Sequence, residues 1–241
     1  MSLPTVACVR GLAYCIVAFA LSSAVSCAGN PRPSASGDSF DLVVAATTDV
    51  HGRLTGWDYY AGTPDSTRGL ARAATIVDSV RAVNPDRVVL VDAGDVLQGS
   101  PLTFVAARID TVDSHPVIAA MNTMRYDAAV IGNHDFGYGL GTLGRAIKEA
   151  SFPFLAANTY LANGPRAYPA FVIVRRGNVR VGIVGATTPG AALWERDNLR
   201  GRVVVRDILP ELRTAVLEAR SKGADVIVVS KTKPNRTNRR N

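Results

Sequence analysis

Cysteine is scarce in this chain, and its few copies lie close to the N-terminus. The 241 residues hold three cysteines, Cys8, Cys15 and Cys27, all within the first 27 positions. So few cysteines exclude a disulfide-rich scaffold. No thiol follows Cys27. We therefore interpret the cysteines as part of an export signal and not as a redox or metal-binding feature.

A surplus of basic charge is also missing from most of the chain. The net charge is +7, but five of the 27 basic residues lie in the segment 231–241 and one is Arg10. Residues 27–230 are left with 21 basic against 20 acidic side chains. This balance gives no basic face, so no nucleic-acid polymer is expected as a partner. An apolar fraction of 47% excludes a wholly disordered chain.

The N-terminal residues have the pattern of an export signal. Arg10 precedes a largely apolar run over 11–25, which is short for a membrane span and typical of a signal peptide. We expect a signal peptide over 1–26 and a flexible tether over 27–39. The segment ending at Cys27 resembles a bacterial lipobox, which predicts a membrane-anchored lipoprotein lipidated at Cys27. It also fits ordinary signal peptidase cutting at the same bond, which predicts a soluble periplasmic protein with no membrane contact.

Short β-branched runs alternate with amphipathic stretches from Phe40 onward. This alternation predicts an α/β layered domain over 40–230, and the turn at Arg176-Gly177-Asn178 predicts a hairpin that makes the sheet mixed. Strands are predicted over 41–47, 87–92, 128–131, 154–158, 170–175, 179–187 and 224–229, and helices over 69–83, 116–124, 140–150 and 209–221. The first strand is expected to be buried. The first helix is expected to bury one apolar face, formed by Leu70, Ala73, Ile76, Val77 and Val80.

Metal-ligand side chains follow three of the predicted strands. Asp49 and His51 follow the first strand, Asp95 follows the second, and Asn133 and His134 follow the third. Because sites in open α/β sheets form at the carboxyl ends of strands, these side chains are expected to converge. Carboxylate, amide and imidazole donors suit Mn, Zn, Fe or similar divalent ions, and Asp95 can bridge two of them.

Taken singly, each of these fragments is also typical of turn chemistry, and it is their order that indicates a site. His115 has no partner motif and is interpreted as a surface or helix-start residue.

As an ordered set, six stretches resemble the calcineurin-like metallophosphoesterases, and among them the exported 5′-nucleotidase and 2′,3′-cyclic-nucleotide phosphodiesterase family. The resemblance covers about residues 40–230 and is carried by TTDVHGRL from Thr47, GLARAATIV from Gly69, DAGDVLQGSPL from Asp92, IGNHDFGYG from Ile131, FPFLAANTY from Phe152 and VGIVGATTP from Val181.

The resemblance implies a layered sandwich with a mixed sheet and flanking helices that hydrolyses phosphoester bonds of nucleotides with two divalent ions, Mn, Zn, Fe or Mg. It implies that Asp49 and His51 hold one ion, Asp95 bridges, and Asn133 holds the other. A metal-activated water would be the nucleophile. His134 would stabilise charge or protonate the leaving alkoxide, with Asp135 as a catalytic or a structural neighbour.

Two departures from the family pattern stand out. Gly137 occupies the position where many such nucleotidases place an aspartate that orients the catalytic histidine, so the orienting partner of His134 is open. Lys231 follows Ser230 where the family continues with a metal-ligating histidine, and a protonated lysine cannot ligate a cation.

The basic stretch 231–241 therefore departs from the family. A frameshift, an artificial truncation and a natural tail are the alternatives, and reduced activity is expected. Competing hypotheses are an inactive fragment that binds metal or nucleotide, and a sulfur-oxidising thiohydrolase of the same superfamily.

Overall fold

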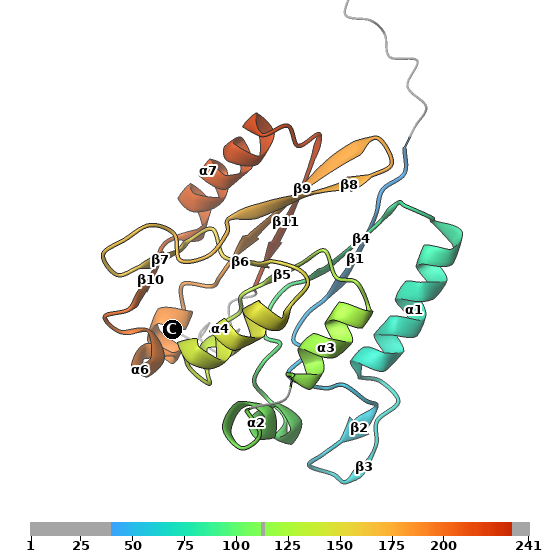
Figure 1. The fold of residues 1–241 in the computed structure, drawn as a ribbon, viewed down its shortest axis with the longest axis vertical. Coiled ribbons are helices and arrows are strands. Elements are labelled where there is room, and N and C mark those ends of the chain that lie inside the picture. Colours follow the sequence, from blue (N-terminus) through green and yellow to red (C-terminus); the bar gives the residue numbers. More distant parts are fainter. Residues whose placement is uncertain (1–39, 112–113, 233–241) are drawn as a thin grey trace, which may run out of the picture. The chain divides into compact units, whose positions relative to one another are not determined.

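The computed structural model describes residues 40–111 and 114–232 (Figure 1). The predicted signal peptide, Cys27, the tether and residues 233–241 lie outside these ranges. Within the described ranges, no helix is both long enough and apolar enough to cross a membrane.

The first sheet is entirely parallel and carries the predicted ligand loops. Its order is β1-β4-β5-β6, and every neighbouring pair is parallel. Its strands are β1 (Val43–Thr47), β4 (Val88–Asp92), β5 (Ala128–Val130) and β6 (Phe154–Leu155).

The second sheet holds the predicted hairpin. Its order is β11-β9-β8, with β8 antiparallel and β11 parallel to β9. Its strands are β8 (Phe171–Arg176), β9 (Val179–Ala186) and β11 (Val226–Lys231). The sequence predicted one mixed sheet, but the structure has a parallel sheet and a mixed one. They separate because Val181 and Ile183 of β9 pack face to face on Val89 and Val91 of β4.

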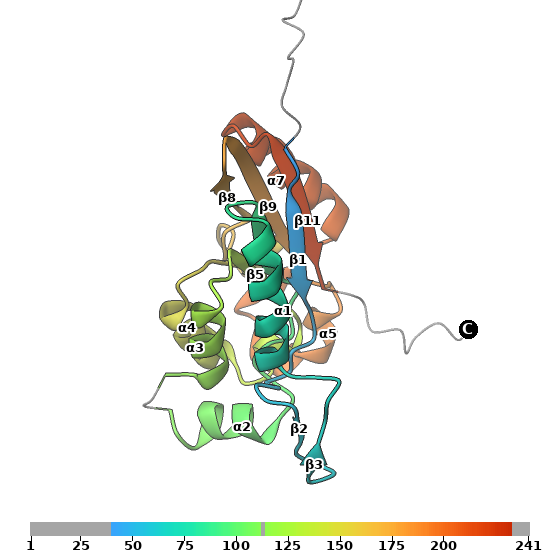
Figure 2. The ribbon, with the colours of Figure 1, turned by 90° about the vertical axis from the view of Figure 1, so that its right-hand side faces the viewer.

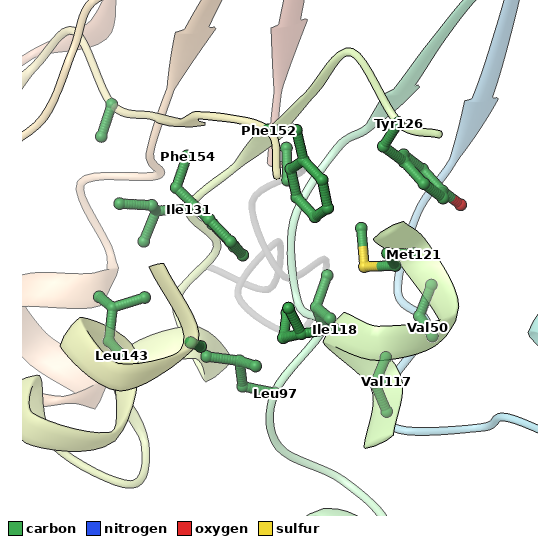
Figure 3. Close-up of a cluster of buried hydrophobic side chains, with 14 of the residues drawn as sticks. Val50, Leu97, Val117, Ile118, Met121, Tyr126, Ile131, Leu143, Phe152 and Phe154 are labelled. Carbon is green, nitrogen blue, oxygen red and sulfur yellow. The ribbon is translucent and has the colours of Figure 1, made fainter. Parts of the chain in front are cut away.

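Helices cover both outer faces of the paired sheets (Figures 1 and 2). The first sheet packs on α1 (Leu70–Val83), α3 (Pro116–Thr123) and α4 (Leu140–Glu149) through the core drawn in Figure 3. The second sheet packs on α7 (Ile208–Ser221), whose Ala215 and Ala219 meet Val184. This layered α/β sandwich confirms the predicted fold class.

Several short elements were not predicted. The helix α2 (Pro101–Arg108) begins at Ser100, whose side chain accepts a hydrogen bond from the Thr103 amide, with Pro101 at its first position. The sequence has the Ser-Pro pair that is typical of a helix start, but threonine replaces the usual Glu or Gln three residues after the cap. The others are β2 (Trp57–Asp58), β3 (Thr63–Pro64), β7 (Thr159–Leu161), β10 (Val203–Val205), α5 (Ala191–Trp194), α6 (Arg196–Leu199) and the 3₁₀ turn η1 (His134–Phe136).

Three local predictions were wrong. The first strand is half-exposed, with Val44 43% exposed, because β1 is an edge strand that pairs only with β4 among the described strands. Ile76, predicted on the buried face of α1, is 66% exposed, and Leu70 and Val77 fill that role. The last strand runs on to Lys231, which lies opposite Ala186, so the change in composition falls inside a strand.

His115 begins a helix as predicted but does not lie on the surface. It caps α3 and is 1% exposed, and its backbone N–H donates to Glu149 Oε2 at 2.7 Å. No described residue bonds its ring nitrogens. Burial lowers the pKa of His115 to about 4, so its ring is neutral at physiological pH.

Candidate metal centre and active site

Three loops meet at the carboxyl edge of the parallel sheet, one after each of β1, β4 and β5. The first two are joined by backbone hydrogen bonds from Asp49 N to Gly94 O at 3.0 Å and from His51 N to Asp95 O at 2.9 Å. The third is joined to the second because His134 N donates to Asp95 Oδ1 at 2.9 Å. The side chains of the predicted site are therefore held on a cross-linked backbone.

His51, Asp95 and His134 form one compact cluster. One ligand atom from each lies within 4.8 Å of the others. The two imidazoles meet edge to face, with centroids 4.8 Å apart and planes at 79°. Two nitrogens and a carboxylate at this spacing can hold a divalent cation.

Asp95 is the buried charge at the centre of this cluster. It is 5% exposed. Burial raises its pKa, while the hydrogen bond from His134 N and the neighbouring histidines act in the opposite direction. A buried carboxylate is costly unless a cation or hydrogen bonds compensate it, so a divalent ion would stabilise this arrangement.

Asp49 and Asn133 lie beside the cluster. Asp49 Oδ1 is 3.8 Å from His51 Nε2, and its side chain is 55% exposed. Asn133 is 8% exposed and directly precedes η1. The structure thus brings His51, Asp95 and His134 together, with Asp49 against His51 and Asn133 next in the chain to His134. His134, which was predicted to be catalytic, also lies close enough to His51 and Asp95 to bind the same metal ion.

The candidate ligands adopt an unusual backbone conformation. Asp49, His51 and Asp95 have φ values of 53°, 47° and 66°. Only Asp86 and Arg125 share this left-handed region among the described non-glycine residues. Such residues cost roughly 1–3 kcal/mol each and concentrate at functional sites, which supports a functional role for these loops.

Asp135 bonds to backbone rather than facing the cluster. Its oxygens accept from the amides of Val96 at 2.8 Å, Leu97 at 2.9 Å, Asp95 at 3.1 Å and Gly132 at 2.7 Å. Burial and the charge of Asp95 raise the pKa of Asp135 to about 6, against these hydrogen bonds. Of the two roles left open by the sequence, this geometry supports the structural one and gives no support to catalysis.

Gln98 contacts both cluster histidines, and sequence reasoning gave it no role. Its backbone oxygen lies 2.6 Å from His51 Nδ1, and its side-chain Oε1 lies 2.8 Å from His134 Nδ1. A carbonyl only accepts, so His51 carries a proton on Nδ1 and its Nε2 lone pair is free for a metal. The only signal in the sequence was the place of Gln98 in the loop after Asp95.

Two cavities flank the cluster. One, of about 320 Å³, is lined by Asp49 together with Arg53, Arg68 and Arg72. The other, of about 430 Å³, is lined by Gln98 and the aromatic residues Tyr60, Phe104 and Tyr138. Volumes of this size admit small molecules.

The carboxyl end of β11 reaches the same edge of the sheets. The Thr232 methyl lies 3.3 Å from where a Cβ on Gly94 would stand. Thr232 is 3% exposed, whereas Lys231 before it is exposed. Lys231, at the position where the family pattern has histidine, is thus the last residue of β11, which ends beside the loop after β4.

Comparison with known proteins agrees with this geometry. No family model matches the chain. The chain is 37% identical over 202 residues to the trifunctional nucleotide phosphoesterase protein YfkN of Bacillus subtilis, and the match covers 78% of the chain and 14% of that protein. The crystal structure described as calcineurin-like phosphoesterase YfkN superposes with a TM-score of 0.74 and 36% identity, over 80% of this chain and 63% of that one. Over the matched residues, the chain is a homologue of calcineurin-like phosphoesterases.

Two further relatives are named for activity on nucleotides. The chain is 36% identical over 200 residues to the 2′,3′-cyclic-nucleotide 2′-phosphodiesterase/3′-nucleotidase of Haemophilus influenzae, covering 78% of the chain and 30% of that protein. It is 28% identical over 217 residues to the 5′-nucleotidase of Vibrio cholerae, covering 88% of the chain and 37% of that protein. The chain spans well under half the length of these curated relatives.

Proposed function

We propose that this chain is a calcineurin-like phosphoesterase that hydrolyses phosphoester bonds of nucleotides with divalent metal ions held at the carboxyl edge of the parallel sheet. The observation that carries the proposal is the buried Asp95 carboxylate between His51 and His134. The same three loops carry the ordered motifs shared with the family. The higher identity to the cyclic-nucleotide phosphodiesterase than to the 5′-nucleotidase favours a cyclic or 3′-phosphoester substrate over a 5′-phosphoester.

We assign Asp49, His51 and Asp95 to metal binding, with Asn133 as a further oxygen donor. Bound divalent ions of this kind neutralise charge on a phosphoryl group and activate a water. The protein residues supply the rest. His134 would stabilise charge or protonate the leaving alkoxide. Asp135 holds the second and third loops in register through its four amide contacts.

The flanking cavities give two surfaces for substrate. The arginine-lined cavity beside Asp49 suits an anionic phosphate, because guanidinium groups bind phosphate oxygens with charge-assisted hydrogen bonds. The aromatic cavity beside Gln98 suits the apolar face of a base.

The test is a turnover assay of the purified chain with Mn²⁺ on bis-p-nitrophenyl phosphate, 2′,3′-cyclic AMP and AMP. We expect metal-dependent hydrolysis that Asp95→Asn and His134→Ala abolish. Asp86→Asn is the matched control, since Asp86 also has a positive φ of 57° but lies in the exposed turn before β4. Absence of metal-dependent turnover would reject the enzymatic proposal for this chain.

A second candidate function is metal or nucleotide binding without catalysis. Lys231 favours it, because a protonated ammonium stands where the family pattern has a ligand histidine. Under this proposal Mn²⁺ binds with no turnover, and Lys231→His raises Mn²⁺ affinity. If Lys231→His leaves affinity unchanged, position 231 contributes no ligand and this candidate loses its support.

We also propose export, on the sequence pattern of residues 1–26 alone. Expression in a bacterial host with radiolabelled palmitate separates the two exported forms. Label that is lost in Cys27→Ser indicates a lipoprotein. Unlabelled chain released with the periplasm indicates a soluble one, and unprocessed chain in the cytoplasm rejects export.

A further inference from the structure

We propose that Gln98 is the positioning residue for the catalytic histidine. Its side chain fixes the tautomer and orientation of His134, while its backbone oxygen does the same for His51. The consequence for catalysis rests on the proposed phosphoesterase function. The positioning itself does not, and can be measured on the metal-free chain.

The first support is that Gln98 contacts the Nδ1 nitrogen of both imidazole rings. Gln98 O lies 2.6 Å from His51 Nδ1, and Gln98 Oε1 lies 2.8 Å from His134 Nδ1. With Nδ1 engaged on each ring, both Nε2 atoms are left for the cluster. Hydrogen bonding at one imidazole nitrogen commonly sets the tautomer available at the other.

The second support is that the Gln98 side chain occupies the space that a side chain at position 137 would need. Its φ of −62° and ψ of −28° are open to any residue, so the backbone does not require glycine there. A Cβ at this position would lie 2.2 Å from Gln98 Oε1 and 2.5 Å from Gln98 Nε2. The absence of a side chain at 137 is therefore what lets Gln98 reach His134.

The third support is the close fit of the next residue in the same loop. Gly99 has a φ of 136°, and a Cβ there would lie 2.7 Å from His51 Cβ and 2.8 Å from His51 Nδ1. Gly99 thus permits the approach of His51 to the Gln98 carbonyl. The Gln98-Gly99 dipeptide presents one acceptor to each histidine.

The direct test is the imidazole ¹⁵N spectrum of the metal-free chain labelled at histidine, recorded at about pH 8, where unperturbed imidazole is neutral. We expect His51 and His134 both to carry the proton on Nδ1. In Gln98→Ala, His134 should move toward the Nε2-protonated tautomer that free imidazole favours. His51 should not change, because its acceptor is backbone, and it reports that the loop is intact.

Two companion variants separate a specific contact from a general disturbance. Gln98→Glu keeps an acceptor and should keep the Nδ1 proton on His134. Gly137→Asp combined with Gln98→Ala places a carboxylate in the vacated space and should restore that proton. Gly137→Asp alone should disturb His134, because its Cβ collides with Gln98. An unchanged His134 tautomer in Gln98→Ala would overturn the proposal.

The kinetic consequence can be read from two leaving groups. With Mn²⁺ present, we expect Gln98→Ala to lower kcat about tenfold or more for 2′,3′-cyclic AMP, whose alkoxide leaving group takes a proton from Nε2 of the His134 imidazolium while Nδ1–H stays bonded to Gln98 Oε1. The loss should be smaller for bis-p-nitrophenyl phosphate, whose phenolate leaves unaided, with KM little changed for both. Equal losses on both substrates would contradict positioning of a proton donor. If the unmodified chain has no turnover, the proposed function fails, and the tautomer measurement still decides the role of Gln98.

Discussion

The three loops after β1, β4 and β5 and the second sheet with its hairpin differ in how their turns are built. In the hairpin between β8 and β9, the left-handed position is filled by Gly177, with a φ of 55°. In the loops, Asp49, His51 and Asp95 occupy that region although a glycine would be less strained. The hairpin has the residue that is least strained in this conformation, whereas the loops have aspartate and histidine there at a cost in stability.

The two regions also differ in where their polar groups go. The second sheet faces the first through apolar residues such as Val181 and Ile183, which are fully buried. The end of β4 and the loops bury the carboxyl groups of Asp92, Asp95 and Asp135, and the Asp95 backbone N–H donates to Asp135 Oδ2. Parallel strands end at one edge, so their loops gather charge there. We therefore expect mutations to separate cleanly into scaffold and site effects.

The largest expected effect concerns pH and the carboxylate of Asp92, which lies fully buried at the end of β4. Burial raises its pKa from 3.8 to about 8, against hydrogen bonds from Thr47 Oγ1 and Gly94 N. Because the folded chain holds this proton more tightly, stability should fall as pH rises from about 4 to about 8 and then level off. Asp92→Asn has no carboxyl proton to lose, so it should remove this part of the fall in unfolding free energy. The part removed should be several kcal/mol, because a shift of one pKa unit corresponds to about 1.4 kcal/mol.

Denaturant melts of both proteins at several pH values check this prediction. The two should be similarly stable near pH 4, where Asp92 is protonated, and the variant should be more stable near pH 8. Parallel pH profiles for the two proteins would show that Asp92 does not cause the fall.

The next effect belongs to the second sheet. Ile183→Ala removes a fully buried side chain between the two sheets and should cost about 3 kcal/mol of unfolding free energy. Mn²⁺ affinity, measured where the variant is folded, should not change. A loss of affinity would show that the sheet interface and the loops are coupled.

A smaller effect of opposite sign is expected in the loops. Asp49→Gly relieves a left-handed aspartate and should raise stability by about 1 kcal/mol. The same change removes a candidate ligand and should weaken Mn²⁺ binding about tenfold or more. Thermal melts and metal titrations on one preparation test both halves. A variant that is destabilised and binds metal normally would reverse the assignment.

The smallest effect is expected in the hairpin. Gly177→Asn should change stability by less than about 0.5 kcal/mol, because asparagine tolerates the left-handed region, whereas Gly177→Ala should cost about 1 kcal/mol. Neither should alter Mn²⁺ binding. A larger loss in Gly177→Asn would show that the turn is constrained by more than its φ.

The fold was largely predictable because apolar periodicity in this chain follows burial. The main helices and strands began within a residue or two of their predicted positions, although the last strand ends at Lys231 rather than at the predicted 229. The split into two sheets was not predictable, because the same alternation in β9 fits either an edge pairing or a face-to-face packing. The exposure of Val44 and Ile76 and the burial of His115 also depend on which elements lie alongside.

The candidate site was predictable in its loops and only partly in its contacts. The residues after three strands identified His51, Asp95 and His134 because parallel strands end together. The backbone contacts of Asp135 and the contact between Gln98 and His134 were not predictable. Apart from the contact between Asp135 and the nearby Gly132, they join segments 36–40 residues apart in the chain, and no local pattern specifies such pairs.

The central claim is that the three loops form a divalent metal site around Asp95, and calorimetric Mn²⁺ titration tests it most directly. The unmodified chain and Asp86→Asn should show the same saturable binding. Asp95→Asn and His51→Ala should each lose about tenfold or more in affinity while remaining folded. Equal Mn²⁺ affinity in Asp95→Asn and the unmodified chain would contradict the claim.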